Sequence, residues 1–227
     1  MHLKKPTIVL FDMDGTTVRH INPWLLGLLE TIDDFTFFVT KFLRKKDSFK
    51  LPAPENKKKP RLLAHKALHK VRRKEVDEIV QPCPGIFPVL DYLKEQSIPL
   101  GIVSNGLGKG YGHDVLEKFG LDQYFQSAVF REDIVRSKPY PDPIVESLEN
   151  LKVNSNEDHV IWYIGDRRKD ILAALHANSL LNCSVIPFSY GIHAAVTILE
   201  KGIGQENIIV NYEDFLFLIE GLFESNQ

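Results

Sequence analysis

Residues 7–16 of this chain read Thr-Ile-Val-Leu-Phe-Asp-Met-Asp-Gly-Thr, and this stretch decides the fold. The apolar residues up to Phe11 are typical of a short buried strand, and Asp12 and Asp14 follow at its carboxyl end. Side chains at i and i+2 of an extended chain point to the same side, and open α/β sheets bind ligands at the carboxyl ends of their strands. Two carboxylates held there either repel each other or share a cation, so the stretch predicts a magnesium site with one carboxylate left for chemistry.

The composition indicates a soluble globular protein. The chain has 227 residues, of which 44% are hydrophobic and 26% charged, which suits one large domain or one domain with a sizeable insert. Its two cysteines, Cys83 and Cys183, exclude a disulfide framework and a four-cysteine zinc site, and they fit a cytoplasmic protein. The apolar run after Lys4 and Lys5 is too short for a signal peptide, and we expect no transmembrane helix. The oligomeric state is not predicted.

Basic residues are concentrated in one segment. Residues 41–74 hold 14 Lys or Arg and 2 acids, so the segment carries a net charge of +12 and the rest of the chain -14. We favour the interpretation that this is a solvated face balancing an acidic remainder. Two alternatives stay open: attraction of a multiply anionic substrate, and contact with an anionic partner such as nucleic acid or a membrane surface.

Residues 18–81 have a helical pattern. Asn22 and Pro23 suit the start of a helix, and apolar residues then recur at helical spacing as far as Leu43. After a proline-containing loop, a second helix is expected over residues 61–80. We therefore predict an all-helical insert at 18–81 within a core domain made of residues 1–17 and 82–227.

After residue 82 the pattern alternates between helices and strands. Such alternation predicts a mostly parallel, doubly wound α/β sheet of the Rossmann type with helices on both faces. Trp162 and Tyr163, in one of the apolar runs, are interpreted as packing residues. Beyond residues 7–11 the expected strands are 98–103, 128–130, 160–164, 184–188 and 208–210, and the expected helices are 86–95, 115–119, 142–151, 171–176 and 215–222.

Polar clusters follow several of these strands. Parallel strands end at the same edge of a sheet, so the clusters should converge there. Each cluster is weak evidence alone, since Asp-Gly and Ser-Asn-Gly are ordinary turns and Lys-Pro is an ordinary exposed loop. Their order and spacing together make them specific. The clusters are Asp12 to Thr16, Ser104-Asn105-Gly106, Lys138-Pro139 and Asp166 to Asp170.

These four motifs, in this order, resemble those of the haloacid dehalogenase superfamily, and specifically its phosphatases with a helical cap inserted after the first motif. The resemblance covers essentially all of the chain outside the insert. It is nearest to phosphoglycolate-phosphatase-like and phosphomutase-like members. It implies a magnesium-dependent phosphomonoester hydrolase that acts on a small phosphorylated metabolite through an aspartyl-phosphate.

The resemblance also implies roles for individual residues. Asp12 would be the nucleophile, and Asp14 the general acid and base. Mg²⁺ would be bound by Asp12, by the backbone carbonyl of Asp14 and by Asp166, with Asp170 behind them or acting through water. Charge on the transferred phosphoryl group requires fixed donors. The implied donors are Ser104, Asn105, Lys138 and Thr16.

The sequence departs from the family directly after its first motif. Thr17 stands where Leu is usual, and Arg19 where an acid is usual. Arg19 and His20 are interpreted as structural charges at the hinge of the insert. Asp14 favours ester hydrolysis, because the phosphonate-cleaving relatives lack the second aspartate. The alternative hypotheses are a phosphomutase or phosphotransferase that uses Asp12 in the same way, and a binding role for the basic segment.

Overall fold

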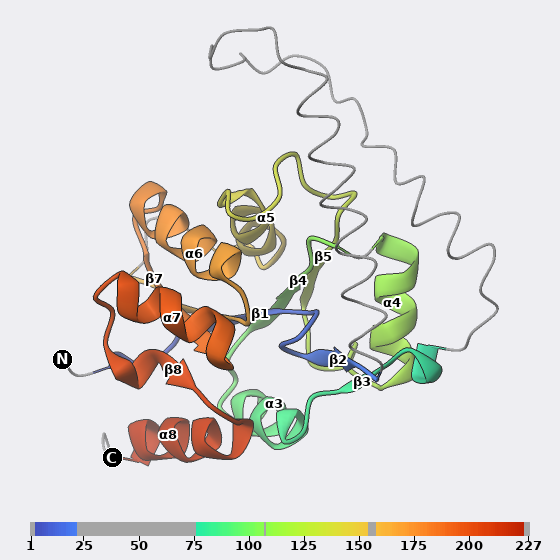
Figure 1. Cartoon of the computed structure of the whole chain (residues 1–227), viewed down its shortest axis with the longest axis horizontal. Helices are drawn as coiled ribbons and strands as arrows, with labels where there is room; N and C mark the ends of the chain where they lie inside the picture. The colour runs from blue at the N-terminus through green and yellow to red at the C-terminus, as the bar shows by residue number, and fades with distance from the viewer. Residues whose placement is uncertain (1–2, 22–75, 107, 154–157, 225–227) are drawn as a thin grey trace, which may run out of the picture.

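The computed structural model describes residues 3–21, 76–106, 108–153 and 158–224, and a six-stranded sheet forms their centre (Figure 1). The strand order is β5-β4-β1-β6-β7-β8, and every neighbouring pair is parallel. This confirms the predicted α/β fold with a doubly wound parallel sheet. The strands are β1 (Ile8–Asp12), β4 (Leu100–Val103), β5 (Ser127–Val129), β6 (Val160–Gly165), β7 (Ser184–Tyr190) and β8 (Ile208–Ile209).

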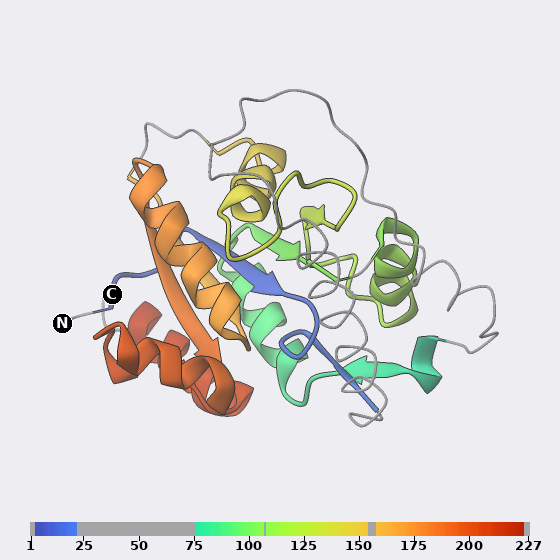
Figure 2. The ribbon, with the colours of Figure 1, turned by 45° about the horizontal axis from the view of Figure 1, so that its top comes forward.

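Helices cover both faces of the sheet, because β1 is apolar on both sides. Val9 and Phe11 pack in one core with α3, α4 and α8, whereas Ile8 and Leu10 pack in a second core with α5 and α6. The two layers lie on opposite sides of β1 (Figures 1 and 2). The helices are α3 (Ile86–Glu95), α4 (Lys109–Lys118), α5 (Asp142–Asn150), α6 (Arg168–Leu180), α7 (Ile192–Glu200) and α8 (Tyr212–Glu224).

The chain reverses its direction of winding at β1, and this reversal positions the site. From β1 the chain passes to β4 and β5 on one side, and it returns to β6 on the other side. Such a switch point opens a crevice beyond the carboxyl ends of the central strands. The register places Asp12 beside Val103 of β4, and Phe11 beside Ile164 of β6. Residues that follow β4 and β6 therefore emerge next to Asp12.

The two ends of the predicted insert are not helical. β2 (Val18–His20) pairs antiparallel with β3 (Val80–Pro82), and a short 3₁₀ turn at Val76–Glu78 precedes β3. The all-helical prediction for residues 18–81 is therefore wrong at these ends. Each strand has only three residues and its partner lies about sixty positions away, so neither gives a local signal.

Other parts of the insert lie outside the described residues. The predicted helix after Pro23, residues 61–75 of the predicted helix over 61–80, and the basic segment 41–74 all fall within residues 22–75. The domain boundaries at residues 17 and 82 stay a prediction. No helix among the described residues is long and apolar enough to cross a membrane.

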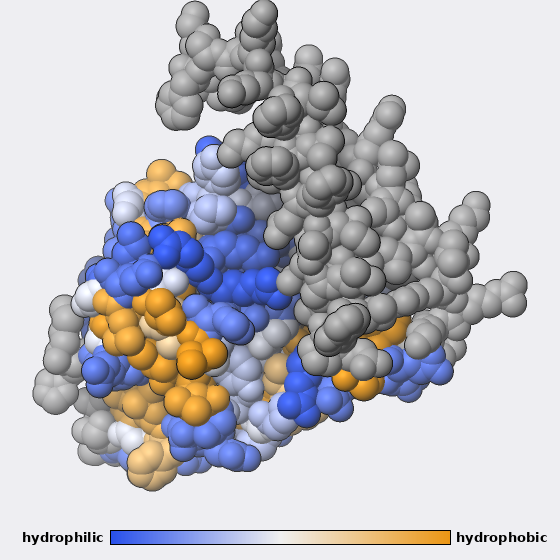
Figure 3. Space-filling view, in the orientation of Figure 1, coloured by the Kyte–Doolittle hydropathy of each residue, from blue (hydrophilic) through white to orange (hydrophobic). Residues whose placement is uncertain are grey.

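Three helices, α4, α6 and α8, are longer than predicted, α5 ends one residue earlier than predicted, and the sequence pattern does not predict α7. α4 begins at Lys109 rather than at Val115, because Gly110 and Gly112 hide the periodicity of its first turns. α7 carries apolar residues on its exposed side as well as on its buried side, so no single hydrophobic face stands out. The exposed apolar residues of α7 are Ile192, Val196 and Leu199, and an apolar patch covers the surface over this helix (Figure 3).

Gly112 gives a direct test of the packing between α4 and the sheet. A Cβ atom added at Gly112 would lie inside the contact distance of the Phe130 ring, whereas one added at Gly110 in the same helix would meet no atom within 4 Å. We expect Gly112→Ala to lower the free energy of unfolding by about 1–3 kcal/mol through overpacking. Gly110→Ala should cause no loss, since alanine favours helix. Equal effects of the two substitutions in urea unfolding would contradict this packing.

Candidate active site

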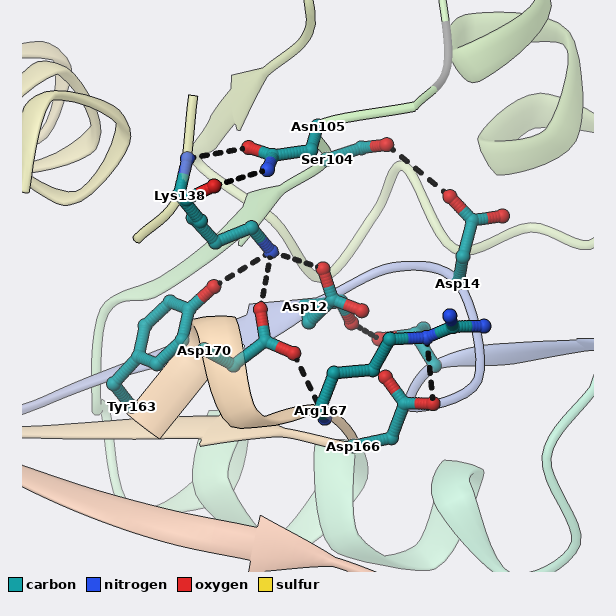
Figure 4. Close-up of polar contacts among 10 residues, drawn as sticks. Asp12, Asp14, Ser104, Asn105, Lys138, Tyr163, Asp166, Arg167 and Asp170 are labelled. Carbon is teal, nitrogen blue, oxygen red and sulfur yellow. Dashed lines mark hydrogen bonds and ion pairs between the residues drawn. The ribbon is translucent and has the colours of Figure 1, made fainter. Parts of the chain in front are cut away.

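The carboxyl ends of three neighbouring strands meet at one edge of the sheet, and the candidate residues follow them directly (Figure 4). β1 ends at Asp12, β4 leads into Ser104, and β6 leads into Asp166. The first turn of α6 carries Asp170, and Lys138 enters from the connection between β5 and α5. The structure thus brings together side chains that are up to 158 positions apart in the sequence.

The ammonium group of Lys138 is the centre of these contacts. Its Nζ is fully buried, donates hydrogen bonds to Asp12 Oδ1 and, over 2.9 Å, to the Tyr163 hydroxyl, and lies 2.7 Å from Asp170 Oδ1. Burial opposes the charged form, but the carboxylates of Asp12 and Asp170 outweigh it, so the pKa of Lys138 is raised well above its usual value. The group therefore stays an ammonium ion at physiological pH.

Asn105 fixes the backbone of Lys138. The Asn105 Oδ1 accepts a hydrogen bond of 3.0 Å from Lys138 N, and the Asn105 Nδ2 donates one of 3.2 Å to the Lys138 carbonyl. These two bonds link the end of β4 to the loop before α5. The sequence predicts a phosphate contact for Asn105, whereas its side-chain amide in the structure is directed at Lys138.

Three carboxylates lie close enough together to hold one cation. Oxygen atoms of Asp12, Asp166 and Asp170 lie within 4.8 Å of one another. The buried Asp166 Oδ1 has no hydrogen-bond partner among the described residues, as expected of an atom that ligates an ion. With the ammonium of Lys138, the three carboxylates leave a net charge of -2, which matches a divalent cation. Hard carboxylate oxygens are the donors that Mg²⁺ prefers, so the residues present fit this ion.

The charge of this cluster acts on the pKa values of its members. Burial raises the pKa of Asp12, the Lys138 ammonium opposes this, and the neighbouring aspartates add to the increase, so the pKa lies well above its usual value. Burial, supported by Asp170, raises the pKa of Asp166 to about 6, against the opposing effect of Arg167 and Lys138. A cation beside these groups favours their ionised forms and would lower both pKa values.

Asp14 lies to one side of the buried cluster (Figure 4). Its Oδ2 accepts a hydrogen bond of 3.3 Å from the Ser104 hydroxyl, and its Oδ1 lies 3.8 Å from His20 Nε2 on β2. The Asp14 side chain is 28% exposed, whereas that of Asp12 is 8% exposed. Asp14 is therefore partly accessible to solvent, while Asp12 is buried and held in a fixed position.

Two glycines allow the carboxylates to come this close. Gly15 has a φ of 87°, which is unfavourable for residues with a Cβ atom, and an added Cβ would collide with the Asp166 carboxylate. At Gly165 an added Cβ would collide with Asp170. The orientation of the Asp170 carboxylate is also fixed by its other oxygen, because Oδ2 accepts a hydrogen bond of 3.0 Å from the backbone N–H of Arg167.

Thr16 and Thr17 lie beneath this loop. Thr16 is fully buried, its carbonyl accepts a hydrogen bond of 2.9 Å from Tyr212, and its hydroxyl has no hydrogen-bond partner among the described residues. The Thr17 hydroxyl donates a hydrogen bond of 2.8 Å to the Asp12 carbonyl. Thr17 and Tyr163 thus contact the cluster although the sequence did not mark them as site residues. Of the two, only Tyr163 has a signal in the sequence, namely a hydroxyl group within an apolar strand.

Comparison with known proteins assigns the family. A family model described as haloacid dehalogenase-like hydrolase matches residues 9–181. The chain belongs to this family. The predicted family and the predicted hydrolase class are therefore confirmed.

Relatives of this haloacid dehalogenase-like hydrolase include proteins named as a pyrophosphatase and as a phosphoglycolate phosphatase. Pyrophosphatase PpaX from Halalkalibacterium halodurans is 28% identical over 179 residues, which covers 74% of this chain and 79% of that protein. Phosphoglycolate phosphatase from Yersinia pestis is 29% identical over 143 residues, which covers 63% of this chain and 57% of that protein.

Solved structures of the superfamily share the fold. A hydrolase from Ehrlichia chaffeensis has a TM-score of 0.60 at 21% identity, and the match covers 98% of this chain and 100% of that one. β-Phosphoglucomutase from Clostridium difficile also has a TM-score of 0.60, at 18% identity, and the match covers 97% of this chain and 98% of that one.

The cation site predicts a pH dependence of metal binding. If Mg²⁺ binds at this cluster, protons would compete with it for Asp166, whose pKa is raised to about 6 by burial and by Asp170. As the pH falls through 6 the carboxylate becomes protonated, so the affinity must fall. Between pH 7.5 and pH 5.5 we expect the dissociation constant to rise by about fourfold or more from Asp166 alone. Isothermal titration calorimetry of the metal-free protein measures this, and an affinity that is unchanged or higher at pH 5.5 would contradict the site.

Proposed function

We propose that this haloacid dehalogenase-like hydrolase is a magnesium-dependent phosphomonoester hydrolase that forms an aspartyl-phosphate at Asp12. The observation that carries the proposal is the setting of Asp12. Its carboxylate is buried, is hydrogen-bonded to the Lys138 ammonium, and lies beside two further carboxylates that can hold a cation. A fixed anionic nucleophile with neutralising charge around it is what attack on a phosphate ester requires.

The first step is attack on phosphorus by an Asp12 carboxylate oxygen. Lys138 engages Oδ1, which leaves Oδ2 to form the new P–O bond. The bond from phosphorus to the ester oxygen breaks, and its electron pair goes to the leaving oxygen. Asp14 gives this oxygen its proton, and the partial exposure of Asp14 allows that proton to be replaced.

The second step is hydrolysis of the aspartyl-phosphate. Asp14, now a carboxylate, takes a proton from water as the water oxygen attacks phosphorus. The bond between phosphorus and Asp12 breaks, its electrons return to the Asp12 carboxylate, and inorganic phosphate leaves. Ser104 lies 3.3 Å from Asp14 Oδ2 and so is placed to orient this carboxylate and to donate to a phosphate oxygen.

The cation is proposed to be Mg²⁺, held by Asp12, Asp166 and the Asp14 carbonyl. Its chemistry when bound is to neutralise negative charge shared by the nucleophile and the phosphate. Asp170 is proposed to lie behind the residues that bind the metal directly, or to reach the metal through water. Its contacts to Lys138 and to the Arg167 backbone are in keeping with this position.

The phosphate itself is proposed to be bound by Ser104, Lys138, Thr16 and Asn105. Lys138 would attract it through its charge alone, because its three N–H groups already face protein oxygens. For Asn105, whose side chain holds Lys138, the phosphate contact would come from its backbone N–H. For Thr16, whose hydroxyl is buried beneath the loop, it would likewise come from the backbone.

The substrate is proposed to be a small phosphorylated metabolite in the cytoplasm. The name phosphoglycolate phosphatase denotes hydrolysis of a small phosphate ester, which supports this class, whereas the name pyrophosphatase denotes hydrolysis of a phosphoanhydride and supports only a small phosphate compound. The domain division is also a proposal: core residues 1–17 and 82–227 would supply the chemistry, and residues 18–81 would select the leaving group.

Asp12→Asn gives the main test of the proposed function. The substitution keeps the shape of Asp12 and removes its nucleophilic carboxylate, so phosphate release from a panel of phosphate esters should fall by about a thousandfold or more. The natural chain should also lose its activity when Mg²⁺ is chelated. The matched control is Asp122→Asn, which changes an exposed aspartate between α4 and β5 and should leave the rate unchanged.

The outcomes of that panel separate the competing functions. Activity that persists in Asp12→Asn would exclude the proposed nucleophile. Turnover that appears only when a sugar bisphosphate is added would indicate a phosphomutase, which uses the same aspartate but returns the phosphoryl group to a hydroxyl. Absence of turnover in the folded natural chain would reject the hydrolase proposal for the esters tested.

Asp14→Asn tests the two-step mechanism. With p-nitrophenyl phosphate the leaving group needs no general acid, so the first step should survive while the second slows by about 10²–10⁴-fold. We expect a rapid burst of about one p-nitrophenol per enzyme molecule followed by slow turnover. Stopped-flow absorbance measures the burst. A variant that loses the burst together with turnover would contradict the role of Asp14 as the base of the second step.

A further inference from the structure

The Lys138 ammonium is surrounded by three oxygen atoms that come from three different elements. An ammonium group has three N–H donors, and here the neighbouring oxygens belong to Asp12 of β1, Asp170 of α6 and Tyr163 of β6. The Nζ atom is fully buried, so an N–H that lost its oxygen would have no bulk water to replace it. The direction in which Lys138 points therefore depends on all three partners.

Tyr163 is the uncharged member of this set. Its ring is fully buried in the core formed with α6, and it lies two residues before Gly165, so that its hydroxyl reaches the edge of the sheet (Figure 4). Burial raises the pKa of Tyr163 well above its usual value, so the hydroxyl stays neutral. The neutral Tyr163 oxygen accepts the third N–H of Lys138 without adding a negative charge. The net charge of the three carboxylates and the ammonium therefore stays at -2.

We propose that Tyr163 is a positioning residue for the reaction: its hydroxyl fixes the Lys138 ammonium, which in turn holds Asp12 in the orientation for attack. The proposal rests on the proposed role of Asp12 as nucleophile. Tyr163 does not touch the reacting atoms in this scheme and acts only through Lys138. A tyrosine that served the core alone would need no hydroxyl at this point, because the ring already fills the space.

Tyr163→Phe is the direct test, since it removes one oxygen atom and keeps the ring. The freed N–H of Lys138 would turn toward a carboxylate or draw in water, and Asp12 would lose its fixed orientation. We expect kcat to fall by about tenfold or more while KM changes by less than about twofold, because the affected contact belongs to the chemical step. Steady-state kinetics with the best ester of the panel measures both constants.

The matched control is Tyr124→Phe. Tyr124 is also a buried tyrosine whose hydroxyl donates to a carboxylate, that of Asp91 at 2.6 Å. This pair joins α3 to the loop before β5, near the amino ends of the strands. Loss of this hydroxyl should leave kcat unchanged. If both variants reduced kcat equally, a general loss of core stability would explain Tyr163→Phe and the proposal would be overturned.

Combination with Lys138→Met separates positioning from packing. If Tyr163 acts through Lys138, adding Tyr163→Phe to Lys138→Met should change the remaining rate by less than about twofold. If the hydroxyl has an independent structural role, the two losses should multiply. Multiplication in a folded double variant overturns the proposal.

A spectroscopic measurement tests the contact without any activity. Buried ammonium groups exchange protons slowly enough to appear in ¹H–¹⁵N spectra, and Lys138→Met assigns the signal by its disappearance. We expect Tyr163→Phe to shift or broaden this signal and Tyr124→Phe to leave it in place. An unmoved signal in Tyr163→Phe overturns the proposal. If the natural chain releases no phosphate but the signal moves as expected, the contact stands and the proposed function is what fails.

Discussion

The site depends on a single buried ammonium group placed among carboxylates. Carboxylate oxygens of Asp12, Asp166 and Asp170 lie within 4.8 Å of one another. Three negative charges so close together would not all stay ionised in a protein interior without positive charge beside them. Lys138 supplies one positive charge, and a divalent cation would supply the rest. Removing the ammonium would leave uncompensated buried charge, which costs far more than the loss of an exposed ion pair. If Asp12 is the nucleophile, the same arrangement would hold it in a fixed position for attack.

Much of the surrounding structure serves to hold that ammonium in place. Asn105 binds the backbone of Lys138 on both sides, and Tyr163 meets its third N–H. Gly15 and Gly165 permit the close approach of Asp166 and Asp170. These residues come from four separate segments, and only the winding of the sheet on either side of β1 brings them to one edge.

The sequence is sufficient to predict the sheet and that Asp12, Lys138, Asp166 and Asp170 meet at one edge of it. Short apolar strands that end in polar clusters give a strong signal, because strand direction in an α/β sheet fixes where the clusters meet. The pairing of β2 with β3 was missed, since it joins three-residue strands across the whole insert. The contact of the Tyr163 hydroxyl is not predicted for a different reason: an aromatic residue in an apolar strand is normally explained by packing, and the partner of its oxygen depends on Lys138, which is 25 positions away.

Fluoroberyllate binding tests the central claim most directly, because this anion mimics a phosphoryl group on an aspartate carboxylate and requires Mg²⁺ to do so. The measurement is a ¹⁹F NMR spectrum of the protein with beryllium and fluoride, with and without Mg²⁺. If Asp12 is the phosphorylated residue of a magnesium site, protein-bound fluoride signals should appear with Mg²⁺, vanish on chelation and be absent in Asp12→Asn. Bound signals that persist in Asp12→Asn, or no bound signals in the natural chain, would contradict the claim.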